Sequence, residues 1–401
     1  MRILWISCLA WKNEDGYDFP INGPGAVSGS IFQQSMIKGI EEYGFNVDLL
    51  IDYPYADIKF APKRQYFHSR NSKDIIIETC NLPYVSSLFK SFFLKRAVKE
   101  ILKNNKYDYV IAYLIHTPYL EGIKMAKKHD KAIKSVLICP DLPDMMDMNL
   151  KNKHLKSFLK KIYYKKINRL YEYIDSYVLF AESMKERLPI GSKPYTVIEG
   201  IAAVEELNTA QYNIKPNSTR ALMYAGTLHK NIGIENIINS LEYLPNDIEL
   251  WIFGDGEMKE EIVFLAKNDK RIRFYGFMSR EDVFEYEKKA SVLINARNPA
   301  SPFTKYSFPS KTFEYLYSGT PFISTKLEGI PEEYNKYLYL ISDNNPKTIA
   351  EKVMEILNTD VAVLDDRALK AKEFIKSKGY CQQSKKLLDF LKSECYKGPE
   401  S

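Results

Sequence analysis

The 401-residue sequence has no apolar run that approaches the roughly 18 residues that a membrane-spanning helix needs. Met1-Arg2 leads directly into the apolar stretch ILWISCLAW, without the charged start and cleavage site of a secretory signal. We therefore expect a cytoplasmic protein that either stays in solution or lies on a membrane without crossing it.

Cysteine is also scarce, with five scattered residues that are odd in number and show no CxxC or Cys/His spacing. Several lie in apolar stretches, so we expect buried thiols in a reducing compartment and neither disulfides nor zinc. No Asp-x-Asp metal pattern occurs, and no Ser/His/Asp or Cys/His set indicates a protein nucleophile. We expect no metal and no cofactor.

Positive charge is in mild excess, +6 overall, and it is unevenly distributed. Residues 151–170 (KNKHLKSFLKKIYYKKINRL) contain eight Lys or Arg and no acid, and residues 88–103 (LFKSFFLKRAVKEILK) combine five basic residues with Leu, Phe, Val and Ile. Basic amphipathic helices of this kind suit an anionic membrane surface, although a solvated helix face has the same composition. No nucleic-acid-binding motif accompanies the charge, so we expect no nucleic-acid partner.

The first half of the chain alternates short apolar strands with helical patterns. Strands are predicted at 3–7, 46–51, 74–78, 108–112, 135–138, 176–180 and 195–198, and helices at 30–43, 88–104, 119–128 and 155–173. Continuous apolar strands separated by helices are typical of a parallel sheet that is covered on both faces. The predicted fold class is α/β with doubly wound, Rossmann-like sheets.

A second strand–helix series begins near residue 221, after a polar stretch without strong periodicity. We predict an N-terminal domain at 1–202, a linker at 203–217 and a second Rossmann-like domain at 218–380. Residues 381–401 would form a helix returning to the first domain, followed by a tail. Two such domains would enclose a cleft, the usual place for a small ligand.

Three predicted strands of the second domain end in glycine. Gly226-Thr227 is followed by Lys230, Gly254 ends the stretch IFGDGE, and Gly276-Phe277 ends RFYGF. Glycine at a strand end lets a phosphate or a base approach the backbone, and lysine neutralises phosphate. A tight strand-to-helix turn explains each glycine equally well when it is considered alone.

Residues 305–325, KYSFPSKTFEYLYSGTPFIST, carry the most functional information. A Pro-containing loop leads through Ser310 into a short helix with Lys311 and Glu314, and a buried strand follows. At the carboxyl edge of a parallel sheet, lysine suits a phosphate and glutamate a ribose hydroxyl. The helix dipole alone also favours an acidic residue in a first turn.

Taken together in this order, YAGTLHKNIG, IFGDGE, RFYGF, FPSKTFEYLYSGTPFIST and Glu328-Gly329-Ile330-Pro331-Glu332 resemble the donor-binding half of GT-B glycosyltransferases of family 4, the retaining glycosyl transferases group 1. The resemblance covers nearly the whole chain and is strongest at 222–332. It implies two facing Rossmann-like domains and transfer of a sugar from a nucleotide diphosphate sugar with retention of configuration.

The resemblance assigns roles to individual residues. Glu314 matches the ribose-binding glutamate of the Glu-x7-Glu motif, whereas Tyr306 stands where the sugar-binding glutamate is usual. Thr227 and Ile232 replace the usual phosphate-binding Arg and Lys, so Lys230 and Lys311 are the expected cations. The departure at Tyr306 leaves the recognition of the sugar to Tyr306 itself or to backbone groups of the 298–310 loop.

In the first domain, residues 22–29 (NGPGAVSG, with Gly25 and Gly29) resemble the glycine-rich loop that lies under the diphosphate, before a helix expected at Ser30. His116, after a predicted strand, occupies the place of a histidine that faces the donor sugar in similar enzymes. Asp141 and Asp144 follow the next strand and are candidates for contacts with the acceptor, or for helix capping.

The predicted function is transfer of a sugar from a UDP- or GDP-sugar to a hydroxyl of a glycan or of a polyprenyl-linked glycan acceptor, in bacterial surface polysaccharide biosynthesis on the inner face of the cytoplasmic membrane. Two alternatives stay open. One is a GT-B nucleotide-sugar epimerase, which needs carboxylates on both sides of the sugar. The other is a non-catalytic nucleotide-sugar-binding subunit, which the missing Arg and Glu make conceivable.

Overall fold

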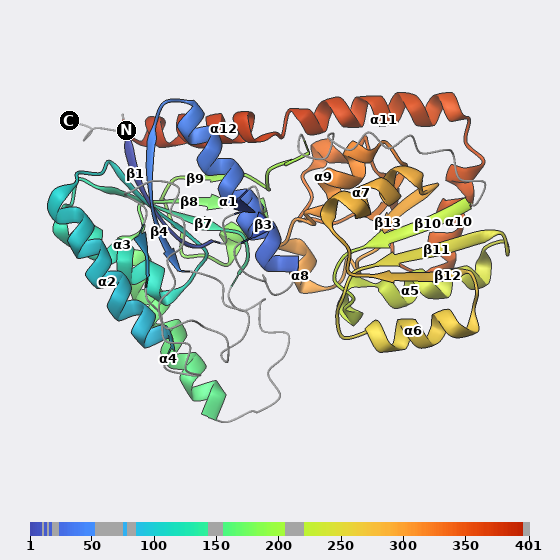
Figure 1. Cartoon of the computed structure of the whole chain (residues 1–401), viewed down its shortest axis with the longest axis horizontal. Coiled ribbons are helices and arrows are strands. Elements are labelled where there is room, and N and C mark those ends of the chain that lie inside the picture. The colour runs from blue at the N-terminus through green and yellow to red at the C-terminus, as the bar shows by residue number, and fades with distance from the viewer. Residues whose placement is uncertain are drawn as a thin grey trace. The chain divides into compact units, whose positions relative to one another are not determined.

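The computed structural model describes residues 1–9, 12–13, 16–17, 24–52, 75–77, 86–142, 155–204 and 220–395. The chain divides into two compact units, Met1–Glu199 with Tyr380–Ser401, and Gly200–Gly379. Each unit is a parallel sheet flanked by helices (Figure 1). The predicted α/β class with two Rossmann-like sheets is confirmed.

The first unit contains a seven-stranded sheet in the order β5-β4-β1-β6-β7-β8-β9, and every described pair in it is parallel. The central strands are buried along almost their whole length, as expected for a sheet covered on both faces. The strands are β1 (Arg2–Cys8), β4 (Asn46–Asp52), β5 (Ile75–Ile76), β6 (Tyr109–Tyr113), β7 (Lys134–Cys139), β8 (Ser176–Leu179) and β9 (Tyr195–Val197), beside a hairpin of β2 (Lys12–Asn13) and β3 (Gly16–Tyr17).

Five α-helices belong to the described part of this unit. Helices α2, α3 and α4 pack side by side, and α12, from the end of the chain, packs against α1 (Figure 1). The Ser384 hydroxyl donates to the Met36 carbonyl at 3.1 Å, and the Tyr109 hydroxyl donates to the Leu391 carbonyl at 2.6 Å. Their bounds are α1 (Pro24–Glu42), α2 (Ser86–Asn104), α3 (Thr117–His129), α4 (Leu155–Leu170) and α12 (Tyr380–Cys395), with 3-10 turns η2 (Tyr171–Tyr173) and η3 (Glu182–Glu186).

The prediction of a glycine-rich loop at 22–29 is wrong from residue 24 onward. Helix α1 begins at Pro24, so Gly25 and Gly29 are helical residues and Ser30 lies in the second turn. Proline suits the first turn of a helix, because the N–H that it lacks has no intrahelical partner there. A Cβ at Gly29 would lie 3.2 Å from the Tyr113 hydroxyl oxygen, so close packing on β6 is a sufficient reason for this glycine.

The second unit contains a six-stranded parallel sheet in the order β12-β11-β10-β13-β14-β15. The chain winds outward in both directions from β10, and the strand order reverses between β10 and β13. In open α/β sheets, ligands bind outside the carboxyl ends of the strands at such a point. The strands are β10 (Arg220–Ala225), β11 (Ile248–Phe253), β12 (Ile272–Gly276), β13 (Val292–Asn295), β14 (Phe322–Thr325) and β15 (Tyr339–Ile341).

Alternate residues of β10 enter two different cores, as the period of two in a strand requires. Met223 and Ala225 pack with α7 and α9, whereas Leu222 and Tyr224 pack with α5, α6 and α10 (Figure 1). The helices are α5 (Ile234–Asn239), α6 (Lys259–Asn268), α7 (Arg280–Lys289), α8 (Pro302–Lys305), α9 (Lys311–Ser318), α10 (Pro346–Leu357) and α11 (Val361–Lys376), with 3-10 turns η5 (Lys230–Ile232), η6 (Ser240–Tyr243) and η7 (Glu332–Tyr334).

The first two residues of the predicted linker pack into the second unit: Val204 is buried with the α7 and α9 core, and the Ala203 carbonyl accepts a hydrogen bond from Arg280 at 2.7 Å. Most of that segment, residues 205–217, lies outside the described residues. Within the described residues, no helix combines the length and the apolar character that spanning a membrane requires.

Candidate functional site

The three glycine-ended strands of the second unit meet at one edge of the sheet. The Gly226 N–H donates to the Phe253 carbonyl at 3.1 Å, and the Gly254 N–H donates to the Gly276 carbonyl at 2.8 Å. The loop after β10 is held further by the Leu228 N–H, which donates to the Asp255 carbonyl at 3.0 Å. The carboxyl ends of β10, β11 and β12 therefore form one continuous rim.

Glycine is required at position 254 for two physical reasons. Its φ is +130°, a conformation that L side chains rarely adopt, and a Cβ there would lie 1.8 Å from the Gly226 carbonyl oxygen. The turns that follow β10 and β11, which we call the exits of these strands, touch through their backbones at this point. A ligand at the rim would therefore face main chain from both turns.

Helix α9 is fastened to the same rim by Tyr315. The buried Tyr315 hydroxyl accepts the Ala225 N–H at 2.7 Å and donates to the Ala225 carbonyl at 3.2 Å. Because Ala225 is the last residue of β10, this pair of hydrogen bonds sets the position of the helix that carries Lys311 and Glu314.

Four charged side chains form a chain of ion pairs beneath this rim. Arg280 Nε lies 2.7 Å from Glu314 Oε1, the Lys311 ammonium contacts Glu314 Oε2, and Lys311 Nζ lies 3.0 Å from Glu287 Oε1. Arg280 also donates to the Ala203 carbonyl at 2.7 Å. The side chain of Glu287 is 0% exposed, against 13% for Glu314 and 25% for Lys311, so Glu287 is the most deeply buried of these three groups.

Burial and pairing act in opposite directions on these groups. Burial raises the pKa of Glu287 to about 7 despite the nearby Lys311. Burial would also raise the pKa of Glu314, but the positive charges of Lys311 and Arg280 outweigh it and lower this pKa to about 2. For Lys311, the two carboxylates overcome burial and raise the pKa well above its ordinary value. At neutral pH, Glu314 is an ionised acceptor.

The sequence analysis missed Arg280 and Glu287. A signal existed for Glu287, because it follows Val283 by one helical turn and so shares the apolar face of α7, where a lone carboxylate needs a buried partner. Arg280 carried no such signal, since its partner lies 34 residues further along the chain.

The other predicted residues of the second unit lie around the rim. Lys230 belongs to η5 and is exposed, as is Thr227. Phe277 is 65% exposed directly after the β12 exit, where Gly276 has a φ of +72°. Tyr306 ends α8 with a partly buried side chain, and Ser310 stands at the N-cap of α9 without a side-chain capping bond.

His116, in the first unit, caps α3 after the exit of β6. Its backbone carbonyl accepts the Tyr119 and Leu120 N–H groups at 3.0 and 3.1 Å, and its ring contacts the Tyr119 ring edge-on at 4.9 Å between centroids. Burial, together with the charge of Lys90, lowers the pKa of His116 to about 4, so the imidazole is neutral at pH 7. Leu114, two residues earlier, has a φ of +84°, a strained conformation for a bulky residue.

The two predicted acceptor-side aspartates are only partly described. Asp141 is exposed just after β7. Burial raises the pKa of Tyr113, and the negative charge of Asp141 raises it further. Asp144 lies outside the described residues.

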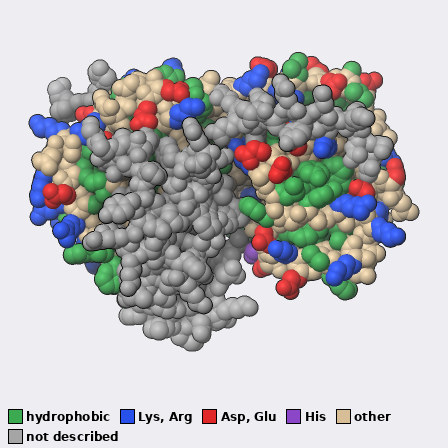
Figure 2. Space-filling model, in the orientation of Figure 1, with side chains coloured by type: hydrophobic (Ala, Val, Ile, Leu, Met, Phe, Trp, Pro, Cys, Tyr) green, Lys and Arg blue, Asp and Glu red, His purple; other side chains and the backbone are tan. Residues whose placement is uncertain are grey.

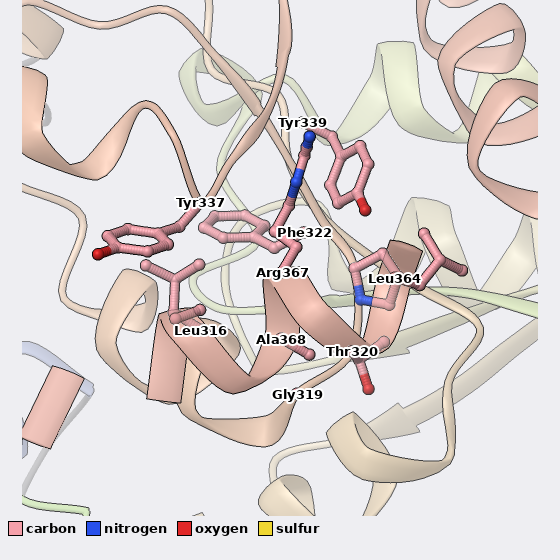
Figure 3. A pocket seen from close by; sticks show the side chains of 11 residues that line it. Leu316, Gly319, Thr320, Phe322, Tyr337, Tyr339, Leu364, Arg367 and Ala368 are labelled. Atoms are coloured by element: carbon pink, nitrogen blue, oxygen red, sulfur yellow. The ribbon is translucent and has the colours of Figure 1, made fainter. Parts of the chain in front are cut away.

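A small pocket lies at the opposite end of the second sheet (Figure 3). Gly319, Thr320 and Phe322, which line it, surround the start of β14, whereas the rim lies at the strand ends. Arg367 stacks on the ring of Tyr339 there, with its Cζ 4.2 Å from the ring centroid. This pocket is therefore separate from the rim.

Comparison with known proteins identifies the part of the chain that carries the rim. Residues 219–359 match the family described as "Glycosyl transferases group 1". An uncharacterised glycosyltransferase of Methanocaldococcus jannaschii is 25% identical over 142 residues, which is 34% of this chain and 38% of the relative. The match thus spans well under half of either protein.

Solved structures match over nearly the full length, at low identity. Sucrose-phosphate synthase from Thermosynechococcus elongatus has a TM-score of 0.71 at 14% identity, covering 99% of this chain and 100% of the other. Anabaena HepE in complex with UDP has a TM-score of 0.67 at 13% identity, with 98% and 100% covered. A glycosyltransferase from Rickettsia africae has a TM-score of 0.64 at 15% identity, with 99% of each covered. The protein has the GT-B fold, and its second unit contains the residues that match the glycosyl transferases group 1 family.

Proposed function

We propose that the protein is a retaining glycosyltransferase that moves a sugar from a UDP- or GDP-sugar to a hydroxyl of a glycan or of a lipid-linked glycan. The observation that carries this proposal is the rim of three backbone-linked glycine exits above an ionised glutamate, Glu314. The glycosyl transferases group 1 match over 219–359 and the likeness to HepE, which was solved with UDP, support the same donor class.

In this proposal, Glu314 accepts the ribose hydroxyls of the donor. Arg280 and Lys311 keep its carboxylate ionised, so it serves as a hydrogen-bond acceptor throughout the physiological pH range. Lys311 has three N–H donors and gives two to carboxylates, which leaves one for a phosphate oxygen. Lys230, at the exposed end of the rim, is the second predicted cation.

The proposed reaction breaks the bond between the sugar C1 and the diphosphate oxygen, and the bonding electrons stay on the diphosphate. A new bond forms between C1 and the acceptor oxygen on the same face of the sugar. The acceptor proton passes to the leaving phosphate, so no protein nucleophile and no metal are required. Positive charge near the leaving group stabilises the charge that develops in the transition state.

The first test is thermal denaturation with UDP, GDP and their sugars. A ligand at 100 times its Kd adds about 2.7 kcal/mol to the free energy of unfolding, so the correct nucleotide raises the melting temperature visibly. The sugar donor that binds is then incubated with candidate acceptors, and the anomeric configuration of the product is read by NMR. An inverted product would contradict retention.

The same assay separates the two alternatives. Formation of an epimeric nucleotide sugar without any acceptor would indicate an epimerase instead. Tight donor binding without turnover on any acceptor would favour a non-catalytic binding subunit. Retained donor turnover after Glu314→Ala would remove Glu314 from the proposed machinery.

We also propose that helix α2 contacts an anionic membrane surface. Phe89 and Phe92 are 42% and 60% exposed. Exposed basic residues follow them along the helix, at the spacing that keeps all of them on one face. Lys and Arg side chains lie with hydrophobic ones along the edge formed by α2 (Figure 2). This exposed face comprises Phe89, Phe92, Arg96, Lys99 and Lys103, and Lys103 pairs with the exposed Glu100 at 2.9 Å. Exposed aromatics beside basic residues are typical of helices that lie in a lipid interface.

A further inference from the structure

Arg280 occupies a position that its own helix does not explain. It is the first residue of α7, and the Ser279 hydroxyl already caps this end by accepting the Asp282 N–H at 3.1 Å. The helix dipole disfavours a positive side chain in a first turn. We therefore attribute this arginine to its tertiary contacts rather than to the stability of α7.

The guanidinium of Arg280 bridges a side chain and a backbone group. Its Nε donates to Glu314 Oε1 at 2.7 Å, and its Nη2 donates to the Ala203 carbonyl, also at 2.7 Å. The side chain is 18% exposed, so both hydrogen bonds are partly shielded from water. Because the guanidinium is a rigid plane, the position of Ala203 constrains the direction from which Arg280 approaches Glu314.

Ala203 is itself held in place. It belongs to residues 200–204, which begin the second unit and which we call the entry segment. The Ala202 N–H donates to the Lys378 carbonyl at 2.9 Å, and Val204 is buried with the α7 and α9 core. The carbonyl that anchors the guanidinium therefore belongs to a backbone that is fixed on both sides.

The entry segment also contacts α9 directly. A Cβ at Gly200 would lie 2.6 Å from Cε2 of Phe313, the residue before Glu314. The segment thus touches both the helix that carries Glu314 and the arginine that holds its carboxylate.

Arg280 and Lys311 act on Glu314 in different ways. Lys311 contacts Oε2 and also pairs with Glu287, and its ammonium is a point charge without a preferred direction. Arg280 instead donates to Oε1 from a fixed direction. A carboxylate has about four acceptor positions, so these two bonds leave capacity for two ribose hydroxyls. The direction of the remaining lone pairs depends on the rotation of the carboxylate, which Arg280 fixes.

We propose that Arg280 is a positioning residue, which ties the Glu314 carboxylate to the entry segment and so orients it towards the ribose of the donor. This assignment rests on the proposed function, because it presumes that Glu314 binds ribose. Compensation of the Glu314 charge is then not sufficient for recognition, because the geometry of the bridge also matters. Since coupling between two sites is reciprocal, a bound ribose also holds the entry segment more firmly.

The first test is calorimetry with UDP or GDP, whichever the wild type binds, and with the 2′,3′-dideoxy form of the same nucleotide. Arg280→Gln is expected to weaken binding of the ribose form about 10-fold and to leave binding of the dideoxy form unchanged. Arg280→Lys keeps the charge but loses the planar fork, so an intermediate loss is expected. In a Glu314→Gln background, Arg280→Gln is expected to cause no further loss, because it acts through that carboxylate.

Arg271→Gln is the matched control. Arg271 also pairs with a carboxylate, that of Asp269 at 2.8 Å, and donates to a backbone carbonyl, that of Leu241 at 2.8 Å. It precedes β12, at the end of the sheet opposite the rim, so nucleotide binding is expected to stay unchanged.

Hydrogen exchange provides a second readout, which a purely structural role would not give. Saturating nucleotide is expected to slow amide exchange in residues 200–204 of the wild type. The same nucleotide, again at saturation, is expected to leave this exchange unchanged in Arg280→Gln.

The outcomes separate the two proposals. Wild-type protein that binds neither UDP nor GDP would overturn the proposed function and, with it, the role of Arg280. Wild-type binding with an unchanged ratio of ribose to dideoxy affinity in Arg280→Gln would overturn only the role of Arg280. Exchange in the entry segment that does not respond to bound nucleotide in the wild type would overturn the coupling. If the Gln variant does not fold, the Lys variant decides by the same ratio.

Discussion

The carboxylate of Glu287 and the ammonium of Lys311 form an ion pair inside the second unit, with 3.0 Å between Oε1 and Nζ. Glu287 is completely buried, and its second oxygen, Oε2, has no hydrogen-bond partner among the described residues. Lys311 therefore neutralises a carboxylate that the interior tolerates poorly, and at the same time contacts Glu314.

The first prediction concerns the stability of this pair. Lys311→Met leaves Glu287 without its cation, so we expect a loss of roughly 3–5 kcal/mol in the free energy of unfolding at pH 8. The double variant Lys311→Met/Glu287→Gln removes the buried charge as well and is expected to recover most of that loss. Urea denaturation of the three proteins measures the difference, and additive effects of the two substitutions would contradict the pairing.

The second prediction is a pH dependence of stability. The pKa of Glu287 in the folded protein, about 7, is higher than its ordinary value of 4.5, so the folded state binds the proton more tightly. The resulting stabilisation is complete below about pH 4.5 and is lost as the pH rises through 7, with a total on the order of 3 kcal/mol at most. Melting temperatures between pH 5 and 8 are expected to fall more steeply in wild type than in Glu287→Gln. Identical slopes would refute the assignment.

The third prediction addresses Glu314 as the ribose acceptor. Glu314→Gln removes the charged acceptor, and we expect about 10-fold weaker binding of the nucleoside that the protein prefers. The same substitution is expected to have no effect on binding of the 2′,3′-dideoxy nucleoside, which lacks both hydroxyls. Calorimetry with the two ligands checks this, and an equal effect on both would place Glu314 away from the ribose.

The fourth prediction tests the contact between two strand exits. Gly254→Ala places an alanine in a backbone conformation with positive φ and makes its Cβ clash with the Gly226 carbonyl oxygen. We therefore expect a loss of more than about 3 kcal/mol in the free energy of unfolding. Gly276→Ala is the control on the same rim, because its φ is +72° but the nearest atom to a Cβ is 4.0 Å away. Strain alone is expected to cost about 1–2 kcal/mol. Similar losses in the two variants, measured by urea denaturation, would argue against the clash.

The fifth prediction concerns the exposed face of α2. Arg96→Gln/Lys99→Gln is expected to weaken binding to vesicles of phosphatidylcholine and phosphatidylglycerol about 10- to 30-fold, at about 1 kcal/mol for each charge. Phe92→Ser removes the apolar contact and is expected to weaken binding to the same vesicles. Lys352→Gln/Lys370→Gln, on the second unit, is the control. Vesicle sedimentation that does not distinguish these variants would rule out α2 as the contact.

Basic residues of α4 provide an independent arm of the same experiment. Lys161 and Lys165 are exposed on this helix, and Lys166 lies 3.2 Å from Glu121, so Lys161 and Lys165 are the better test positions. The side chain of Lys160 lies outside the described residues. Unchanged vesicle binding after neutralisation of Lys161 and Lys165 would restrict the contact to α2.

Local sequence was sufficient to determine most elements of this protein. The strands predicted at 46–51 and 176–180 are observed at Asn46–Asp52 and Ser176–Leu179, and glycine follows or ends β10, β11 and β12 as expected. These features depend on short-range physics, namely the burial of continuous apolar runs and the conformational freedom of glycine. The start of α1 at Pro24 was missed because the glycines beside it resemble a loop, whereas packing of Gly29 on Tyr113 supports a helix.

Only the tertiary structure decided which charges meet. Glu314 was identifiable from its own segment, but Arg280 and Glu287 reach α9 only because α7 and α9 pack against the same face of the second sheet. The rotation of each helix about its axis, which brings partners 34 and 24 residues apart within 3.0 Å, follows from how their apolar faces fit the sheet. That fit is a property of the packed core, so no pattern within a single segment contains it.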